Sequence, residues 1–103
     1  MKIMISQPMR GKSIEQVKSE RIDIVNALEN MGFEIIDTVF GNPIQNDENE
    51  AINNLAESIK CIAKADIIYF MIGWEQSRGC RIEHEVAVQY GKKIIYENQI
   101  KVF

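Results

Sequence analysis

Short apolar runs recur along the chain, separated by longer stretches with a different spacing. Counted together with its flanking polar residues, each run is four to seven residues long, and this length is typical of β-strands. We therefore predict four strands, at Lys2–Ser6, Phe33–Thr38, Asp66–Ile72 and Lys92–Glu97. The third is apolar on both faces, as a buried parallel strand is. A short edge strand is also expected at Ile100–Phe103.

Between the runs, apolar residues recur every three or four positions, which is typical of helices with one buried face. The predicted helices span Ile14–Met31, Glu48–Lys64 and Ile82–Tyr90. Ser13 is the expected N-cap of the first, with Gln16 as its capping-box partner. Its inward stripe is predicted to be Ile14, Val17, Ile22, Val25, Leu28 and Met31, and that of the second Ile52, Leu55, Ile59 and Ile62.

Alternating strands and helices predict one domain over residues 1–103, of the α/β class. We expect three layers, with helices on both faces of a parallel, flavodoxin-like or Rossmann-like sheet of four to five strands in the order 2-1-3-4. Ligands bind such sheets at the carboxyl ends of the strands, where the strand order reverses. The loops that face each other there are Ser6–Lys12 and Gly73–Glu83. The polar loop Gly41–Asn49 is the candidate for a mobile lid.

Both facing loops precede helices, whose N-termini bind anions through unpaired N–H groups. Gly11 and Gly79 would let the backbone approach a ligand, and Arg10 and Arg78 could clamp a phosphate. The alternative is that the arginines are solvated surface charges. Hydroxyl donors lie in or beside the same loops, at Ser6, Ser13 and Ser77. Neither loop matches the glycine patterns of dinucleotide or nucleoside-triphosphate sites.

Glu83 falls in the first turn of the third predicted helix, where the helix dipole favours its ionised form. An ionised carboxylate suits attack on an anomeric carbon, although acidic residues at helix starts often only stabilise the helix. His84 is expected to be exposed. Trp74 could stack on a nucleobase or fill a subunit contact, and these alternatives stay open. Met9 lies in the first loop and is counted with the candidate ligand-binding residues.

Composition narrows the function classes. The chain of 103 residues has a net charge of −3, which argues against a nucleic-acid or membrane-binding surface. Apolar runs are too short for a membrane span, and the N-terminus lacks the pattern of a signal peptide. Cys61 and Cys80, with a single histidine, do not form a structural zinc site. We expect a reduced, cytoplasmic protein without a metal or cofactor.

Two segments in this order resemble the nucleoside 2-deoxyribosyltransferase superfamily: Met1–Gly11, which contains Ser-Gln-Pro-Met-Arg-Gly, and Gly73–Gly91. The chain is similar to its small bacterial and phage branch of DUF4406-like proteins, near the 2′-deoxynucleoside 5′-phosphate N-hydrolases. The resemblance covers nearly the whole chain. It implies that a glutamate, matched by Glu83, attacks the anomeric carbon of the sugar. It also implies a homodimer or higher homo-oligomer, because members of this superfamily complete their sites across dimer contacts.

The resemblance assigns further roles. Ser77 and Gly79 match phosphate-side positions of the monophosphate hydrolases, and Arg10 and Gly11 match their first-loop arginine and glycine. Transferases tend to carry an acidic residue where this chain has Ser77, so a 5′-phosphate is favoured. The family aspartate that assists the leaving base is matched by Ser58, which cannot act as an acid near neutral pH. Glu57 or Asp37 is the expected substitute, unless the protein binds without turnover.

The favoured prediction is a hydrolase that releases the base from a 2′-deoxynucleoside 5′-monophosphate, with base transfer as a variant of the same chemistry. The alternative is a nucleotide-binding module without catalysis, such as a sensor or a sequestering protein. A flavodoxin-like redox or signalling domain is a weaker option, since a fold does not determine a function. The base preference cannot be predicted from these residues.

Overall fold

The structure, a computed structural model, describes residues 1–38 and 47–100. Its centre is a parallel sheet in which four strands have the order β2-β1-β3-β4, as predicted. The strands are β1 (Lys2–Ser6), β2 (Glu34–Ile36), β3 (Ile67–Phe70) and β4 (Lys93–Tyr96). The helices are α1 (Ile14–Asn30), α2 (Glu48–Lys64), α3 (Arg78–Gln89) and the short α4 (Glu97–Ile100), with a 3₁₀ turn, η1, at Trp74–Gln76.

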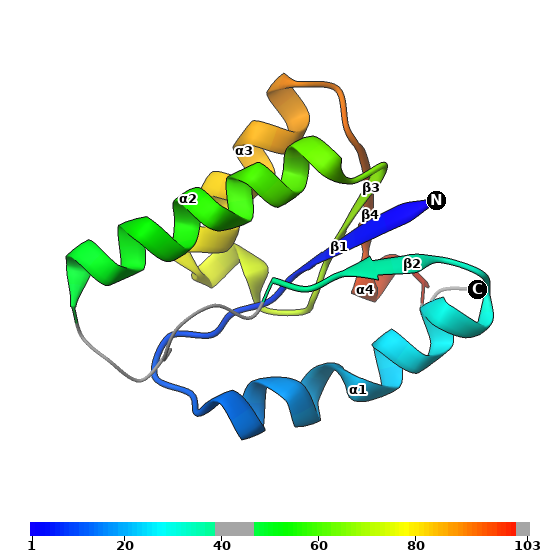
Figure 1. Cartoon of the computed structure of the whole chain (residues 1–103), viewed down its shortest axis with the longest axis horizontal. Coiled ribbons are helices and arrows are strands. Elements are labelled where there is room, and N and C mark those ends of the chain that lie inside the picture. The colour runs from blue at the N-terminus through cyan, green and yellow to red at the C-terminus, as the bar shows by residue number, and fades with distance from the viewer. Residues whose placement is uncertain (39–46, 101–103) are drawn as a thin grey trace.

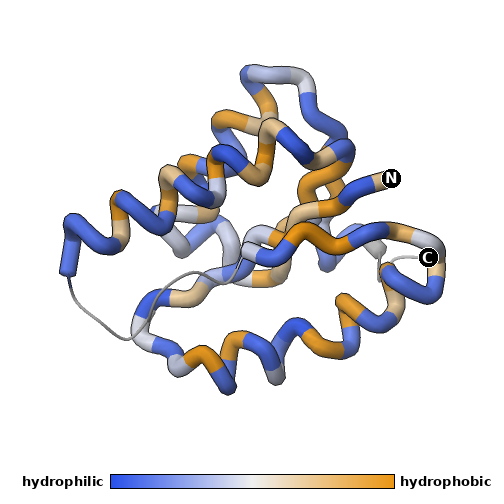
Figure 2. Tube along the Cα trace, in the orientation of Figure 1, coloured by the Kyte–Doolittle hydropathy of each residue, from blue (hydrophilic) through white to orange (hydrophobic). Residues whose placement is uncertain are grey.

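Helices cover both faces of the sheet, with α1 on one side and α2 and α3 on the other (Figure 1). Successive residues of a strand point to opposite faces, so Ile3 and Ile5 of β1 pack with Leu28 of α1, while Met4 packs with Ile62 of α2. Hydrophobic segments occur in the central strands, and they alternate with hydrophilic segments along the helices (Figure 2). This double burial explains why the strands are apolar runs rather than alternating ones.

Several predicted boundaries were wrong. The helix α3 begins at Arg78, four residues before its predicted start, because Ser77 serves as its N-cap. Strands β2, β3 and β4 are shorter than predicted, and Glu97 starts α4 instead of ending a strand. Ile100 closes that helix, and the rest of the predicted edge strand lies outside the described residues. Most of the predicted lid, from Gly41 on, also lies outside them.

The buried stripe of α1 also differs from the prediction. Ser13 caps the helix through the backbone N–H of Gln16, as expected. Ile22 and Met31, however, are 50% and 72% exposed, and Arg21 is buried in their place. In α2 the expected inward residue Ile52 is 63% exposed, while Ser58 is buried. Both helices therefore turn a polar side chain toward the sheet near the carboxyl ends of the strands.

Candidate active site

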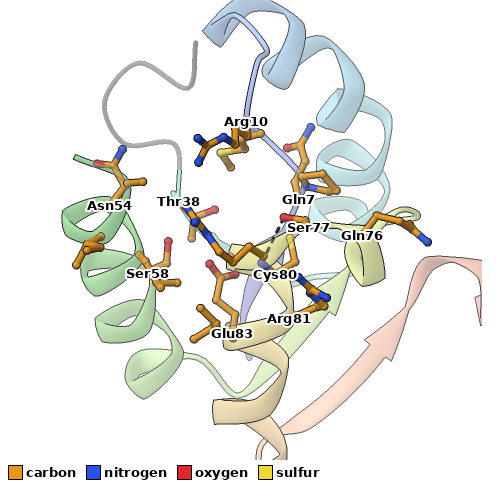
Figure 3. Close-up of a pocket in the computed structure, with 18 of the residues that line it drawn as sticks. Gln7, Arg10, Thr38, Asn54, Ser58, Gln76, Ser77, Cys80, Arg81 and Glu83 are labelled. Atoms are coloured by element: carbon orange, nitrogen blue, oxygen red, sulfur yellow. Dashed lines mark hydrogen bonds between the residues drawn. The ribbon is translucent and has the colours of Figure 1, made fainter. Parts of the chain in front are cut away.

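The two predicted loops meet at the carboxyl ends of β1 and β3. The Met71 N–H donates to the Ser6 carbonyl at 3.0 Å. Gly73 adopts a φ of 94°, and a Cβ there would lie 3.6 Å from the Pro8 ring. Between these loops and α2 lies a pocket with a volume of about 740 Å³ (Figure 3). This volume is in the range of small-molecule sites.

Glu83 lies on the floor of this pocket, on α3, and is only 8% exposed. The Ser6 hydroxyl, at the end of β1, donates to its Oε1 atom at 2.7 Å. Because α3 begins at Arg78, Glu83 is in the second turn of the helix, not in the first. Burial raises its pKa to about 7, and the hydrogen bonds from Ser6 and Ser58 oppose this rise. Burial thus opposes the expected preference of Glu83 for the ionised form, and with a pKa of about 7 the carboxyl group is partly protonated near neutral pH.

Ser58, the residue that matches the family aspartate, lies on α2 and lines the same pocket. It is 8% exposed and interacts with the carboxyl group of Glu83. Neither proposed substitute acid is among the lining residues that the structure describes. Glu57 is exposed and pairs with Lys60 at 3.1 Å, and Asp37 is exposed as well. The structure thus brings a hydroxyl, and not a second carboxyl, next to Glu83 from α2.

The two arginines predicted to clamp a phosphate do lie together in the pocket lining. A third residue, which the sequence did not single out, joins them. Glu48 starts α2; its Oε1 atom accepts a hydrogen bond from Arg10 at 2.8 Å, and its Oε2 atom forms a salt bridge with Arg78 at 2.9 Å. These contacts lower the pKa of Glu48. One carboxylate therefore bridges the two arginines across the pocket, although both remain about half exposed to solvent.

Around the arginines, the remaining predicted phosphate-side residues have separate roles. The Ser77 hydroxyl caps α3 by accepting from the Cys80 N–H at 3.4 Å. Gly79 lines the pocket, and no atom lies within 4 Å of the position a Cβ would take. Met9 lines it too. Gly11 does not, and its φ of 80° shows that it is needed for the turn itself.

Trp74, like Gly11, does not belong to the described pocket lining. Its ring stacks on His84 at a centroid distance of 4.2 Å, and Phe70 lies 5.0 Å from the same imidazole. The Nε2 atom of His84 is 2.6 Å from the Tyr96 hydroxyl. His84 is thus partly buried in an aromatic cluster, which corrects the expectation that it is exposed.

A family model described as "Domain of unknown function (DUF4406)" matches residues 1–96. The chain belongs to this family. No curated protein sequence is significantly similar to it. Among solved structures, the DUF4406 chain is similar to a Clostridium botulinum CMP N-glycosidase, BcmB, with a TM-score of 0.57 and 22% sequence identity. The match covers 93% of this chain and 67% of the other, and at this identity it shows a shared fold.

A buried cation supports the floor of the DUF4406 pocket and was not foreseen. Arg21 of α1 donates from Nε to the Gln7 side chain at 2.9 Å, and from Nη2 to the Ile5 carbonyl and the Thr38 hydroxyl, both at 3.3 Å. It thereby holds both residues that flank Ser6. A signal was present in the sequence, because position 21 follows Val17 by one helical turn on the buried stripe.

The described residues include no group of three or more His, Cys, Asp or Glu side chains placed to hold a metal ion. Within the same ranges, 1–38 and 47–100, no helix is long and apolar enough to cross a membrane.

Proposed function

We propose that this DUF4406 domain hydrolyses the N-glycosidic bond of 2′-deoxynucleoside 5′-monophosphates, with Glu83 as the nucleophile. The observation that carries the proposal is the arrangement of Glu83 and its partners. A carboxyl group is held by Ser6 on a buried floor, and Arg10 and Arg78 line the same pocket. The floor suits the reacting sugar carbon, and the arginines suit a phosphate.

In the proposed reaction the ionised Glu83 attacks the anomeric carbon, and the bond to the base breaks. The base leaves with the bonding electrons, and a deoxyribosyl ester of Glu83 remains. Water then adds its hydroxide to the anomeric carbon, which releases Glu83 and deoxyribose 5-phosphate, while its proton ends on the base. Ser6 orients the attacking oxygen, since it donates to Oε1 at 2.7 Å. Only the deprotonated carboxylate can attack, so the proposed activity rises through the pKa of about 7.

Three further observations support this proposal. The pocket volume of about 740 Å³ accommodates a nucleotide. The sequence resembles the superfamily in which a glutamate performs this attack. The similar solved structure is named a CMP N-glycosidase, an enzyme for a nucleoside monophosphate. Because CMP is a ribonucleotide, the sugar preference must be tested alongside the base preference.

The test is to incubate the protein with each of the four deoxynucleoside monophosphates and with CMP, and to measure free base by chromatography. We expect base release by wild type and its loss, by roughly a thousandfold or more, in Glu83→Gln. Glu85→Gln is the matched control, because Glu85 is exposed on the same helix. Base release that is equal in wild type and Glu83→Gln would refute the nucleophile. Adding a second free base distinguishes transfer, seen as base exchange, from hydrolysis.

A second candidate function is nucleotide binding without turnover. Ser58 favours it, because a hydroxyl stands where the related enzymes carry an acid. This candidate predicts that a nucleotide raises the melting temperature while no base is released. A homodimer or higher homo-oligomer remains our prediction for the assembly, and light scattering of the purified protein measures its mass. A mass equal to one chain would contradict this prediction.

A further inference from the structure

A carboxylate of the protein itself, that of Glu48, lies at the mouth of the pocket. Glu48 extends from the start of α2 to two arginines that belong to different loops, Arg10 after β1 and Arg78 at the start of α3. Each arginine gives one Nη2 contact to a different oxygen of the same carboxylate. The carboxylate thus occupies the position between two guanidinium groups that is the best-suited place in this pocket for an external oxyanion.

The three side chains are about half exposed, at 58% for each arginine and 54% for Glu48. Exposed ion pairs are weak, because water solvates the separated charges well. At this exposure the Glu48 side chain can rotate into solvent. A phosphate brings up to two negative charges and three acceptor oxygens, so it is a stronger partner for two arginines than one carboxylate is.

We propose that Glu48 is a specificity-determining residue, an internal counter-ion that a phosphate must displace from Arg10 and Arg78 to bind. Two consequences follow. A ligand without a phosphate leaves the Glu48 bridge in place and gains nothing from the arginines. A weak anion fails to displace the carboxylate, so the pocket discriminates against singly charged ions such as acetate or chloride. The inference rests on the proposed function only in taking a phosphomonoester as the ligand.

The test measures binding of inorganic phosphate and of deoxycytidine to wild type and to Glu48→Gln by titration calorimetry at pH 7.5. Two exposed ion pairs correspond to roughly a two- to thirtyfold change in a binding constant. We expect Glu48→Gln to bind phosphate more tightly by that factor and to leave deoxycytidine binding unchanged. Glu57→Gln is the matched control, because it makes the same charge change on an exposed position of α2.

Glu48→Asp separates direct contact from charge alone. It keeps the negative charge but is one methylene shorter, so it cannot bridge both arginines, and we expect phosphate to bind more tightly than to wild type. Unchanged or weaker phosphate binding by Glu48→Gln would overturn the inference, as would wild-type behaviour of Glu48→Asp or no measurable phosphate binding by any variant. This test does not depend on the proposed hydrolase activity, because calorimetry measures phosphate binding without turnover. Failure to detect base release would therefore leave the result for Glu48 unaffected.

Discussion

The buried carboxyl group of Glu83 should make the folded state more stable at acidic than at alkaline pH. Its pKa is about 7 in the folded protein, against an ordinary value of 4.5. Between these values the folded state holds a proton that the unfolded state has released, so stability falls as the pH rises from 4.5 to 7. At about 1.4 kcal/mol for each pH unit, the loss is roughly 3 kcal/mol above pH 7.

Replacing Glu83 with glutamine removes this titration and keeps the shape of the side chain. Its amide oxygen can still accept the hydrogen bond that Ser6 donates to Oε1. We expect Glu83→Gln to be more stable than wild type at pH 8 by roughly 3 kcal/mol, and nearly equal to it at pH 4.5. Such a gain is a large part of the roughly 5–15 kcal/mol by which small domains are stable. It corresponds to a melting temperature higher by roughly 10 °C or more.

Urea unfolding followed by circular dichroism, at pH 4.5 and pH 8, measures this difference. Glu85→Gln is again the control, and it should change stability by less than roughly 0.5 kcal/mol at both pH values. The reasoning fails if the advantage of Glu83→Gln is the same at both pH values, or absent at pH 8. Either result would mean that burial does not hold the carboxyl group near a pKa of 7. A confirmed gain would mean that the fold is less stable because it keeps an ionisable group at its site.

Two other substitutions test separate parts of the site. Ser6→Ala removes a hydrogen bond that favours ionised Glu83, so the pKa of Glu83 should rise. The midpoint of the pH profile of kcat/KM should then move upward by roughly one pH unit. A midpoint that stays in place or moves down would contradict this. Gly79→Ala should stabilise α3 by up to roughly 1 kcal/mol in urea unfolding, since a Cβ there meets no atom within 4 Å. The same methyl group enters the pocket, so KM should rise roughly tenfold. An unchanged KM would show that the ligand does not approach Gly79.

The sheet order and the place of the pocket could be predicted from the sequence because both follow from local patterns. Buried parallel strands are apolar runs, and the chain alternates them with helices. Right-handed crossovers then leave few arrangements. The prediction that the loops after β1 and β3 face each other follows from the strand order alone. The same loop pairing places Glu83 at the pocket, although its helix begins earlier than the apolar spacing indicates. Its role as a nucleophile rests on the family resemblance and stays a prediction.

The contacts that tune the site could not be predicted, because they join residues that are distant in sequence. Glu48 has an ordinary helix-start sequence, and only the packing of α2 brings it to Arg10 and Arg78. The raised pKa of Glu83 depends on how deeply α2 and α3 bury it. Trp74 also had no sequence signal for its neighbours, since its aromatic partners come from β3, α3 and β4.

The network of Arg21 has a consequence for how the pocket moves. One guanidinium group ties α1 to the end of β1 and to Thr38, so the residues around Ser6 cannot separate without exposing a buried cation. Amide groups of this floor should therefore exchange with solvent only when α1 itself opens, which is slow. The half-exposed side chains of Arg10, Glu48 and Arg78 can instead change rotamer within nanoseconds. The floor of the pocket thus opens slowly and cooperatively, whereas the side chains at its entrance move fast. Ligand exchange therefore need not disturb the reacting groups.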